Sequence, residues 1–378
     1  MMDHVSAFFG FLAGYILPYV VVLSLLVFVH ELGHYLAGRW SGIRIVAFSI
    51  GFGPELAGFT DKHGTRWKLS AVPLGGYVRF YGDADAASLS DGDELAVMTP
   101  EQRAQTLAGA ALWKRAVTVA AGPIANFIAA IAIFAVMFGT QGKPVADPVV
   151  AEVKPDSAAY EAGVQPGDLL VALDGSHIET FDDVVRYISM RPEIPVVVTV
   201  RRNGGEIALD MVPRRTVTTD RFGNKMEVGQ IGIVTNQQSG NFRIVELTPV
   251  EAVGEGVLQT WHIVTGTFDY LSNLIAGRMN ADQLGGPVRV VQASGQMASL
   301  GIVALVNLAA VLSVSLGLLN LMPVPVLDGG HLVLYALEAI RGKPVGQNAQ
   351  EIAFRIGLVM ILSLMVFATW NDISRLIG

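Results

Sequence analysis

Residues 20–38 read VVVLSLLVFVHELGHYLAG, an apolar run long enough to enter a bilayer that also carries His30, Glu31 and His34. On a helix, His30 and His34 lie four residues apart on one face, so both imidazoles can reach one metal ion. The H-E-x-x-H pattern is typical of sites in which two histidines bind Zn²⁺ and the glutamate takes a proton from metal-bound water. Because ionisable groups in hydrocarbon cost several kcal/mol or more, a metal site explains these three residues better than a structural histidine pair does.

The composition indicates a membrane protein. Of 378 residues, 52% are hydrophobic and 16% charged, and the mean hydropathy is +0.47. The net charge is -7 and there is no long basic run, so nothing suggests a nucleic-acid partner. Since cysteine is absent, a zinc ion must be held by His, Asp or Glu. The N-terminus has no basic region and no cleavage site before the first apolar run, so we expect that run to be retained.

We expect a polytopic α-helical membrane protein with four transmembrane helices, because four apolar stretches reach the roughly 20 residues that a bilayer requires. The expected spans are residues 17–39, 116–138, 301–322 and 352–370. The expected order of regions is a first transmembrane region (1–40), a cytoplasmic-side β-hairpin and loop (41–115), a second helix (116–140), a PDZ-like β-rich domain (143–240), a membrane-surface helix and linker (241–298), a third transmembrane region (299–345) and a fourth helix (350–372).

Residues 43–82 alternate in polarity and are punctuated by glycines, which predicts strands and tight turns. Such a membrane-associated β-hairpin region could offer an edge to an unwound substrate segment by strand addition. The alternative is a small cytosolic hairpin that only packs. Residues 83–112 are polar and acidic, which predicts a solvated loop and a short helix.

The second span is interrupted near its start by Gly122, Pro123 and Asn126, which we assign to helix packing. Beyond it, residues 159–175 read AYEAGVQPGDLLVALDG and resemble the core of a PDZ domain of the bacterial protease type. A generic β-rich domain is the alternative. A PDZ domain would take peptide C-termini or extended segments by strand addition.

Residues 320–330 read NLMPVPVLDGG. Pro323 and Pro325 break the third helix, and we expect Gly329-Gly330 to let the chain turn again. Asp328 lies in an apolar stretch with no basic neighbour, so it needs a partner, and a metal ion is the obvious one. His331 could be mistaken for a further ligand, but His30, His34 and Asp328 already make a three-ligand site.

The basic residues between the first two spans predict the orientation, since cytoplasmic loops are enriched in Lys and Arg. They are Arg39, Arg44, Lys62, Arg66, Lys68, Arg79, Arg103, Lys114 and Arg115. The PDZ-like domain is then extracytoplasmic, and the metal site lies towards the cytoplasmic side of the membrane.

Taken together, these motifs and their order resemble the site-2 protease family, most closely the bacterial branch that cleaves membrane-bound anti-sigma factors. The resemblance implies that His30, His34 and Asp328 bind Zn²⁺, that Glu31 is the catalytic acid/base and that Asn320 holds the substrate backbone. It also implies that Ser49 to Pro54 and Leu74 to Tyr77 grip an extended substrate. Well-studied relatives carry two PDZ domains in tandem, whereas this chain has one convincing copy.

The resulting hypothesis is an intramembrane zinc metalloprotease of the bacterial inner membrane that acts on single-span membrane proteins. Two other classes stay open. A metal-ion transporter would need a polar relay through several spans, but here the polar groups gather at one level. A membrane-anchored PDZ scaffold would have no use for Glu31 beside two ligands.

Overall fold

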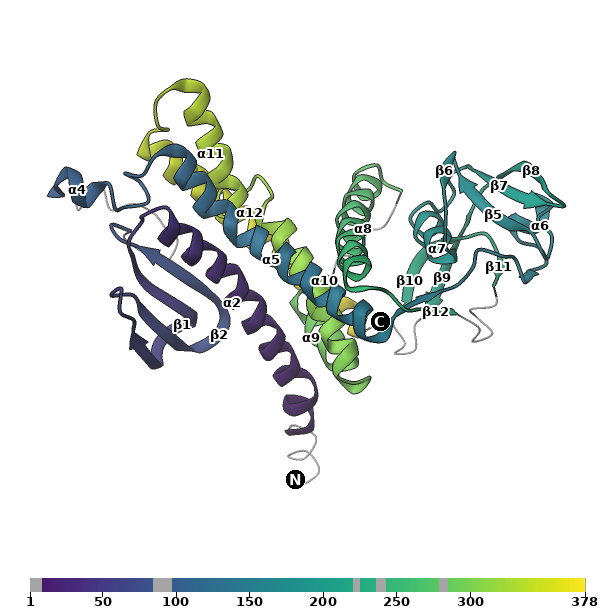
Figure 1. The fold of residues 1–378 in the computed structure, drawn as a ribbon, viewed down its shortest axis with the longest axis horizontal. Coiled ribbons are helices and arrows are strands. Elements are labelled where there is room, and N and C mark those ends of the chain that lie inside the picture. The colour runs from purple at the N-terminus through teal and green to yellow at the C-terminus, as the bar shows by residue number, and fades with distance from the viewer. Residues whose placement is uncertain (1–8, 84–96, 220–224, 236–242, 279–284, 378) are drawn as a thin grey trace. The chain divides into compact units, whose positions relative to one another are not determined.

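The computed structural model describes all residues except 1–8, 84–96, 220–224, 236–242, 279–284 and 378 (Figure 1). Its contacts divide the chain into two compact units, the first formed by Met1–Phe134 and Leu284–Gly378 and the second by Ala135–Gln283. Most of the predicted acidic loop after residue 83 lies outside the described residues. Its predicted short helix is α4, Pro100–Arg103.

Four helices in the described part of the chain are long and apolar enough to cross a membrane. They cover Phe9–Trp40, Leu112–Gln141, Ile302–Asn320 and Asn348–Ser374, and each includes most or all of a predicted span. Their elements are η1 (Leu12–Ile16) with α2 (Leu17–Trp40), α5 (Leu112–Gln141), α10 (Ile302–Asn320) and α12 (Gln347–Ile377). Helix α5 continues through Pro123, so the predicted interruption does not break its backbone. The expectation of a four-span membrane protein is confirmed at this level.

One face of α2 is buried in the first unit. Its buried side chains recur every three or four residues, as an inward-facing helical stripe requires: Val22, Leu26, Val27, His30, Gly33 and His34. Val22 and Leu26 pack against Ala309 of α10. At Gly33 a Cβ atom would lie 2.2 Å from the carbonyl oxygen of Ala121, so α2 and α5 approach more closely here than any larger residue allows.

Strands β1 (Ile45–Thr60) and β2 (Arg66–Phe80) form an antiparallel hairpin beside α2 (Figure 1). The first part of β1 is paired on both sides, because Phe48 lies opposite both Val78 and Trp67. Residues 76–80 therefore form one edge of the curled sheet, and β2 also packs along α2. Asp61, at the hairpin tip, accepts hydrogen bonds from Tyr35 Oη of α2 at 2.9 Å and from Trp67 Nε1 at 3.1 Å. These bonds tie the hairpin to the helix that carries the H-E-x-x-H motif.

The chain enters the third span through a helix where the sequence suggests a linker. Helix α9 (Pro287–Ser299) begins directly after the Gly-Gly pair, within the region that the sequence assigns to a linker. Gly286 is its N-cap residue, and its backbone N–H and that of Arg289 donate to the carboxylate of Asp372 in α12, both at 3.0 Å. A carboxylate at the N-terminus satisfies free N–H groups and complements the helix dipole. Helix α9 also packs against η1, α2 and α10, so this linker is part of the first unit.

The second unit has a β-rich core, as the alternating sequence predicts. Its elements are β3 (Lys143–Val145), β4 (Glu152–Val153), α6 (Ala158–Glu161), β5 (Leu169–Leu173), β6 (Ser176–His177), α7 (Phe181–Ser189), β7 (Val196–Arg202), β8 (Gly205–Met211), β9 (Arg214–Thr219), β10 (Lys225–Gln230), β11 (Ile233–Val234), β12 (Arg243–Val245) and α8 (Pro249–Ile275). Four strands make a sheet in the order β6-β5-β7-β8, and Leu170, Val198 and Val200 lie fully buried in its core.

Helix α8 clusters with this β-rich domain and is not among the four candidate spans. The side chain of Asn273 donates to the carbonyl of Met190 at 2.8 Å, and Lys143 and Glu255 form an ion pair at 2.7 Å. Helix α8 and the strands of the predicted 143–240 domain therefore belong to one compact unit.

Candidate metal centre

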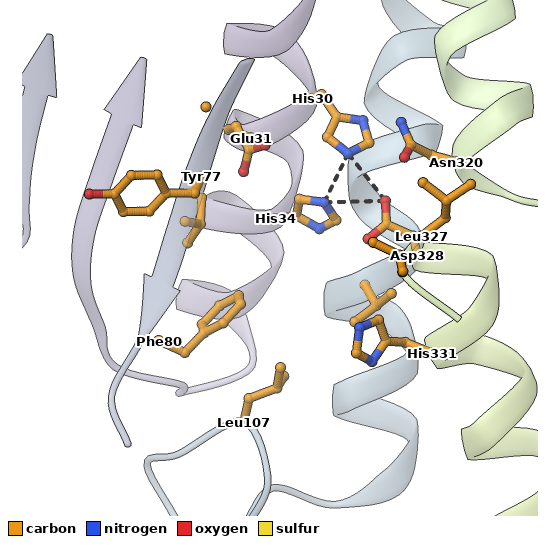
Figure 2. Close-up of a pocket in the computed structure, with 14 residues that line it drawn as sticks. His30, Glu31, His34, Tyr77, Phe80, Leu107, Asn320, Leu327, Asp328 and His331 are labelled. Carbon is orange, nitrogen blue, oxygen red and sulfur yellow. Dashed lines mark hydrogen bonds and ion pairs between the residues drawn. The ribbon is translucent and has the colours of Figure 1, made fainter. Parts of the chain in front are cut away.

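The two histidines of α2 face the first residue of α11 (Asp328–Arg341). His30 Nε2 lies 3.2 Å from His34 Nε2, and Asp328 Oδ2 lies 3.1 Å from His30 Nε2 and 3.5 Å from His34 Nε2. Figure 2 shows the three side chains pointing at one another from two helices. No other group of three His, Asp or Glu side chains among the described residues has ligand atoms this close together. The structure thus brings together the three residues predicted to bind metal.

The donor atoms fit a zinc ion. Tetrahedral ligands about 2.0–2.1 Å from Zn²⁺ are about 3.3–3.4 Å from one another, and the observed separations lie on both sides of that value. His34 Nδ1 lies 2.9 Å from the carbonyl oxygen of Thr118, which can only accept, so Nδ1 carries the proton and Nε2 presents a lone pair. Asp328 Oδ2 is buried and has no hydrogen-bond partner among the described residues. Three potential ligand atoms that converge in this way fit a bound cation.

The segment before α11 explains the two glycines that follow Asp328. Both have helical backbones, so they do not provide the predicted turn. A Cβ at Gly329 would lie 2.3 Å from the carbonyl oxygen of Leu321, and one at Gly330 would lie 2.2 Å from that of Val324. The glycines therefore let the proline-containing turn pack directly on the first turn of α11, and this contact places Asp328.

Glu31 lies beside the histidines and lines a cavity of about 180 Å³. The backbone of Val78 lies close enough to interact with its carboxylate. The cavity is also lined by the three proposed ligands and by Gly76, Tyr77, Phe80, Leu107, Val119, Asn320, Val326, Leu327 and His331. The cavity is therefore lined by the Glu31 carboxylate, by the candidate metal-binding triad and by one edge of the β-sheet.

Asn320 is the last residue of α10 and lines this cavity (Figure 2). Its Nδ2 donates to the carbonyl of Leu316 at 3.0 Å. Of the segments predicted to grip substrate, Gly76 and Tyr77 line the cavity, whereas Ser49 is buried and bonds to Ser70 Oγ and to the carbonyl of Gly51, each at 3.0 Å. His331 also lines the cavity but lies outside the ligand triad.

Two residues of the second span contact the triad, although their sequence context predicts a role in helix packing. A Cβ at Gly122 would lie 2.3 Å from His34 Nε2, so only glycine leaves room for this imidazole. Asn126 is fully buried, and its Nδ2 lies 3.1 Å from His30 Nδ1. Their four-residue spacing in an apolar span was the available signal, since it places both residues on one helix face.

Comparisons with known proteins show which family the chain belongs to. The family model described as Peptidase family M50 matches residues 18–364. A protein named as a zinc metalloprotease in Agrobacterium fabrum is 71% identical over the full length of both chains. The metalloprotease MmpA of Caulobacter vibrioides is 37% identical over 94% of each chain.

A solved PDZ domain of an SdrC-like protein from Listeria monocytogenes is similar to 24% of this chain and 87% of its own, with 22% identity and a TM-score of 0.18. The PDZ-like character of the second unit stays a prediction at this similarity. The family match, by contrast, spans most of the chain. The protein is a membrane zinc metalloendopeptidase, and the chain belongs to peptidase family M50.

Proposed function

We propose that this protein cleaves a peptide bond in or near the transmembrane segment of other membrane proteins. The observation that carries the proposal is the position of His30, Glu31 and His34 on a helix apolar enough to cross a membrane. Asp328 follows a second such helix by eight residues. A protease with its site on these helices meets substrates within the bilayer.

His30, His34 and Asp328 would hold the zinc ion through Nε2, Nε2 and Oδ2. When bound, zinc supplies a Lewis acid that lowers the pKa of a water molecule and polarises the scissile carbonyl. Glu31 accepts the proton that this water loses and returns it to the leaving amine.

The edge formed by residues 76–80 would pair with an extended substrate. A transmembrane helix satisfies its own backbone groups, so its peptide bonds become accessible only where the helix unwinds. Pairing with a strand edge replaces the lost hydrogen bonds, and Asn320 would hold the substrate backbone beside the cavity. Substrates with helix-breaking residues should therefore be preferred.

The orientation follows from the basic residues between the first two spans. We place this segment on the cytoplasmic side of the bacterial inner membrane and the PDZ-like domain on the periplasmic side. That domain would screen peptide C-termini or extended segments. Helix α8 would lie on the membrane surface, since its exposed apolar side chains include Val253, Val257 and Trp261. Suitable substrates are single-span anti-sigma factors or signal-peptide remnants.

The test is cleavage of a single-span model substrate by the purified protein in lipid vesicles. We expect Glu31→Gln to abolish product while leaving zinc bound, and a zinc chelator to abolish product in the wild type. Cleavage that survives in Glu31→Gln would remove Glu31 from the mechanism. A wild type that binds zinc but cleaves no membrane substrate would favour the scaffold or transporter alternatives.

A further inference from the structure

The off-metal nitrogen of His30 has an unusual partner. Asn126 Nδ2 lies 3.1 Å from His30 Nδ1, while Asn126 Oδ1 is buried and has no hydrogen-bond partner among the described residues. The amide therefore contacts His30 through one of its two polar atoms only. A half-turn of the amide exchanges Nδ2 and Oδ1 without moving the helix.

Zinc binding by His30 is compatible with only one of the two orientations of the Asn126 amide. His30 presents Nε2 to His34 and Asp328, so Nε2 must be free of its proton to bind zinc. A neutral imidazole then carries its proton on Nδ1, and that N–H needs an acceptor. We propose that Asn126 is a positioning residue whose Oδ1 accepts the Nδ1–H of His30, fixing the tautomer and ring orientation in which Nε2 faces zinc. The inference rests on the proposed role of His30 as a ligand.

Helix α5 is well placed to orient both histidines. The carbonyl of Thr118 faces His34 Nδ1 at 2.9 Å, and Asn126 faces His30 Nδ1 two turns later. Outer partners of this kind orient metal-binding histidines and raise their basicity. Of these two, only the Asn126 side chain can be removed by substitution, because Thr118 acts through its backbone.

The position of Asn126 is itself constrained by α10. Ser313 Oγ donates to the backbone carbonyl of Asn126 at 2.8 Å, and both residues are fully buried. A Cβ at Gly317 would lie 3.3 Å from Asn126 Cβ, so the two helices are in close contact here. The amide therefore has little freedom except rotation about its own axis, which is the motion that the proposal requires.

The experiment measures zinc affinity of the full chain in detergent by competition with a chelator, comparing Asn126→Leu with Asn126→Asp. Leu removes the acceptor at similar volume, and we expect it to weaken zinc binding about 10- to 100-fold. Asp keeps an acceptor, and we expect its affinity to stay within about threefold of wild type or exceed it. Asn273→Leu, which removes a buried amide hydrogen bond in the second unit, is the matched control and should bind zinc normally.

The outcomes separate this inference from the proposed function. Unchanged affinity in Asn126→Leu, or equal losses in the Leu and Asp variants, would overturn the positioning role while leaving the three ligands intact. If Asn126→Leu does not fold, the Asp variant decides alone, since donation from the Asn amide predicts a loss and acceptance predicts none. A wild type that binds no zinc would overturn both proposals.

Discussion

Asp328 in the first unit and Asp168 in the second are both largely withdrawn from water, but their surroundings differ in kind. Asp168 accepts hydrogen bonds from Arg202 Nε at 2.7 Å, from Arg202 Nη2 at 2.6 Å and from the backbone of Gln165 at 2.9 Å. Asp328 Oδ2 faces two imidazole nitrogens instead, and no described donor satisfies it. A buried carboxylate with matched donors stabilises a fold, whereas one among lone pairs indicates a ligand site.

The strongest test of this comparison replaces Asp328 with leucine. Zinc binding and cleavage should fall to background, because one of three ligands is gone. The metal-free protein should be as stable as metal-free wild type or up to about 4 kcal/mol more stable, since apolar replacement of buried polar clusters is often neutral or favourable. Bound zinc is measured by elemental analysis, and stability by thermal unfolding with chelator.

His331→Gln is the control, because His331 lines the same cavity outside the triad. It should retain stoichiometric zinc. A lower unfolding temperature for metal-free Asp328→Leu than for metal-free wild type would mean that Asp328 stabilises the fold, and the contrast with Asp168 would fail.

A smaller loss of zinc affinity should follow when the space beside His34 is filled by a larger residue at position 122. Gly122→Ala places a methyl group 2.3 Å from His34 Nε2 in the unrelaxed structure, so the imidazole must move. Overpacking of this size costs about 1–3 kcal/mol, which corresponds to a loss of roughly 5- to 150-fold in zinc affinity. Chelator competition measures the change.

Gly139→Ala on the same helix is the matched control. Its new methyl group would meet only Ala252 Cβ at 3.5 Å, which is an ordinary contact. Equal zinc affinities in the two variants would show that Gly122 serves only helix packing, as the sequence alone suggested.

Local patterns were sufficient to predict that His30, His34 and Asp328 could form one metal site and to predict where the long apolar helices lie. The four-residue spacing of His30 and His34 fixes their shared face on any helix, and Asp328 was recognisable as a charge without a partner in an apolar stretch. Both signals depend on residues close together in the sequence. Each of the four spans is likewise recognised from the length and hydropathy of its own residues. Their positions therefore agree with the helices of the structure.

The contacts of Gly122 and Asn126 could not be predicted in the same way. Which face of the second span meets α2 depends on how two helices cross, and that is set by the close approach at Gly33. Helix α9 was missed for another reason, because Gly-Gly-Pro is compatible both with a turn and with an N-cap followed by proline at the first helical position. The Asp372 carboxylate, far away in sequence, stabilises the helical alternative.

The smallest expected effect concerns the carboxylate that is satisfied. Hydrogen bonds from Arg202 hold the pKa of Asp168 below its usual value, against the opposing effect of burial. A carboxyl group with a lowered folded-state pKa contributes stability above its unfolded-state pKa of about 3.9, and that contribution disappears as the pH falls through the folded-state value. Asn keeps an acceptor oxygen but loses the charge, so Asp168→Asn should destabilise the β-rich domain by only about 1 kcal/mol at pH 7, and the difference from wild type should shrink progressively below about pH 4. Hydrogen exchange of β5 in the full chain measures this difference in stability, and zinc content is the control that should not change.

A difference in stability that stayed constant down to pH 2 would show that the ionised form of Asp168 is not what stabilises the domain. Asp168 would then no longer serve as the counterpart of Asp328 whose carboxylate is fully hydrogen-bonded.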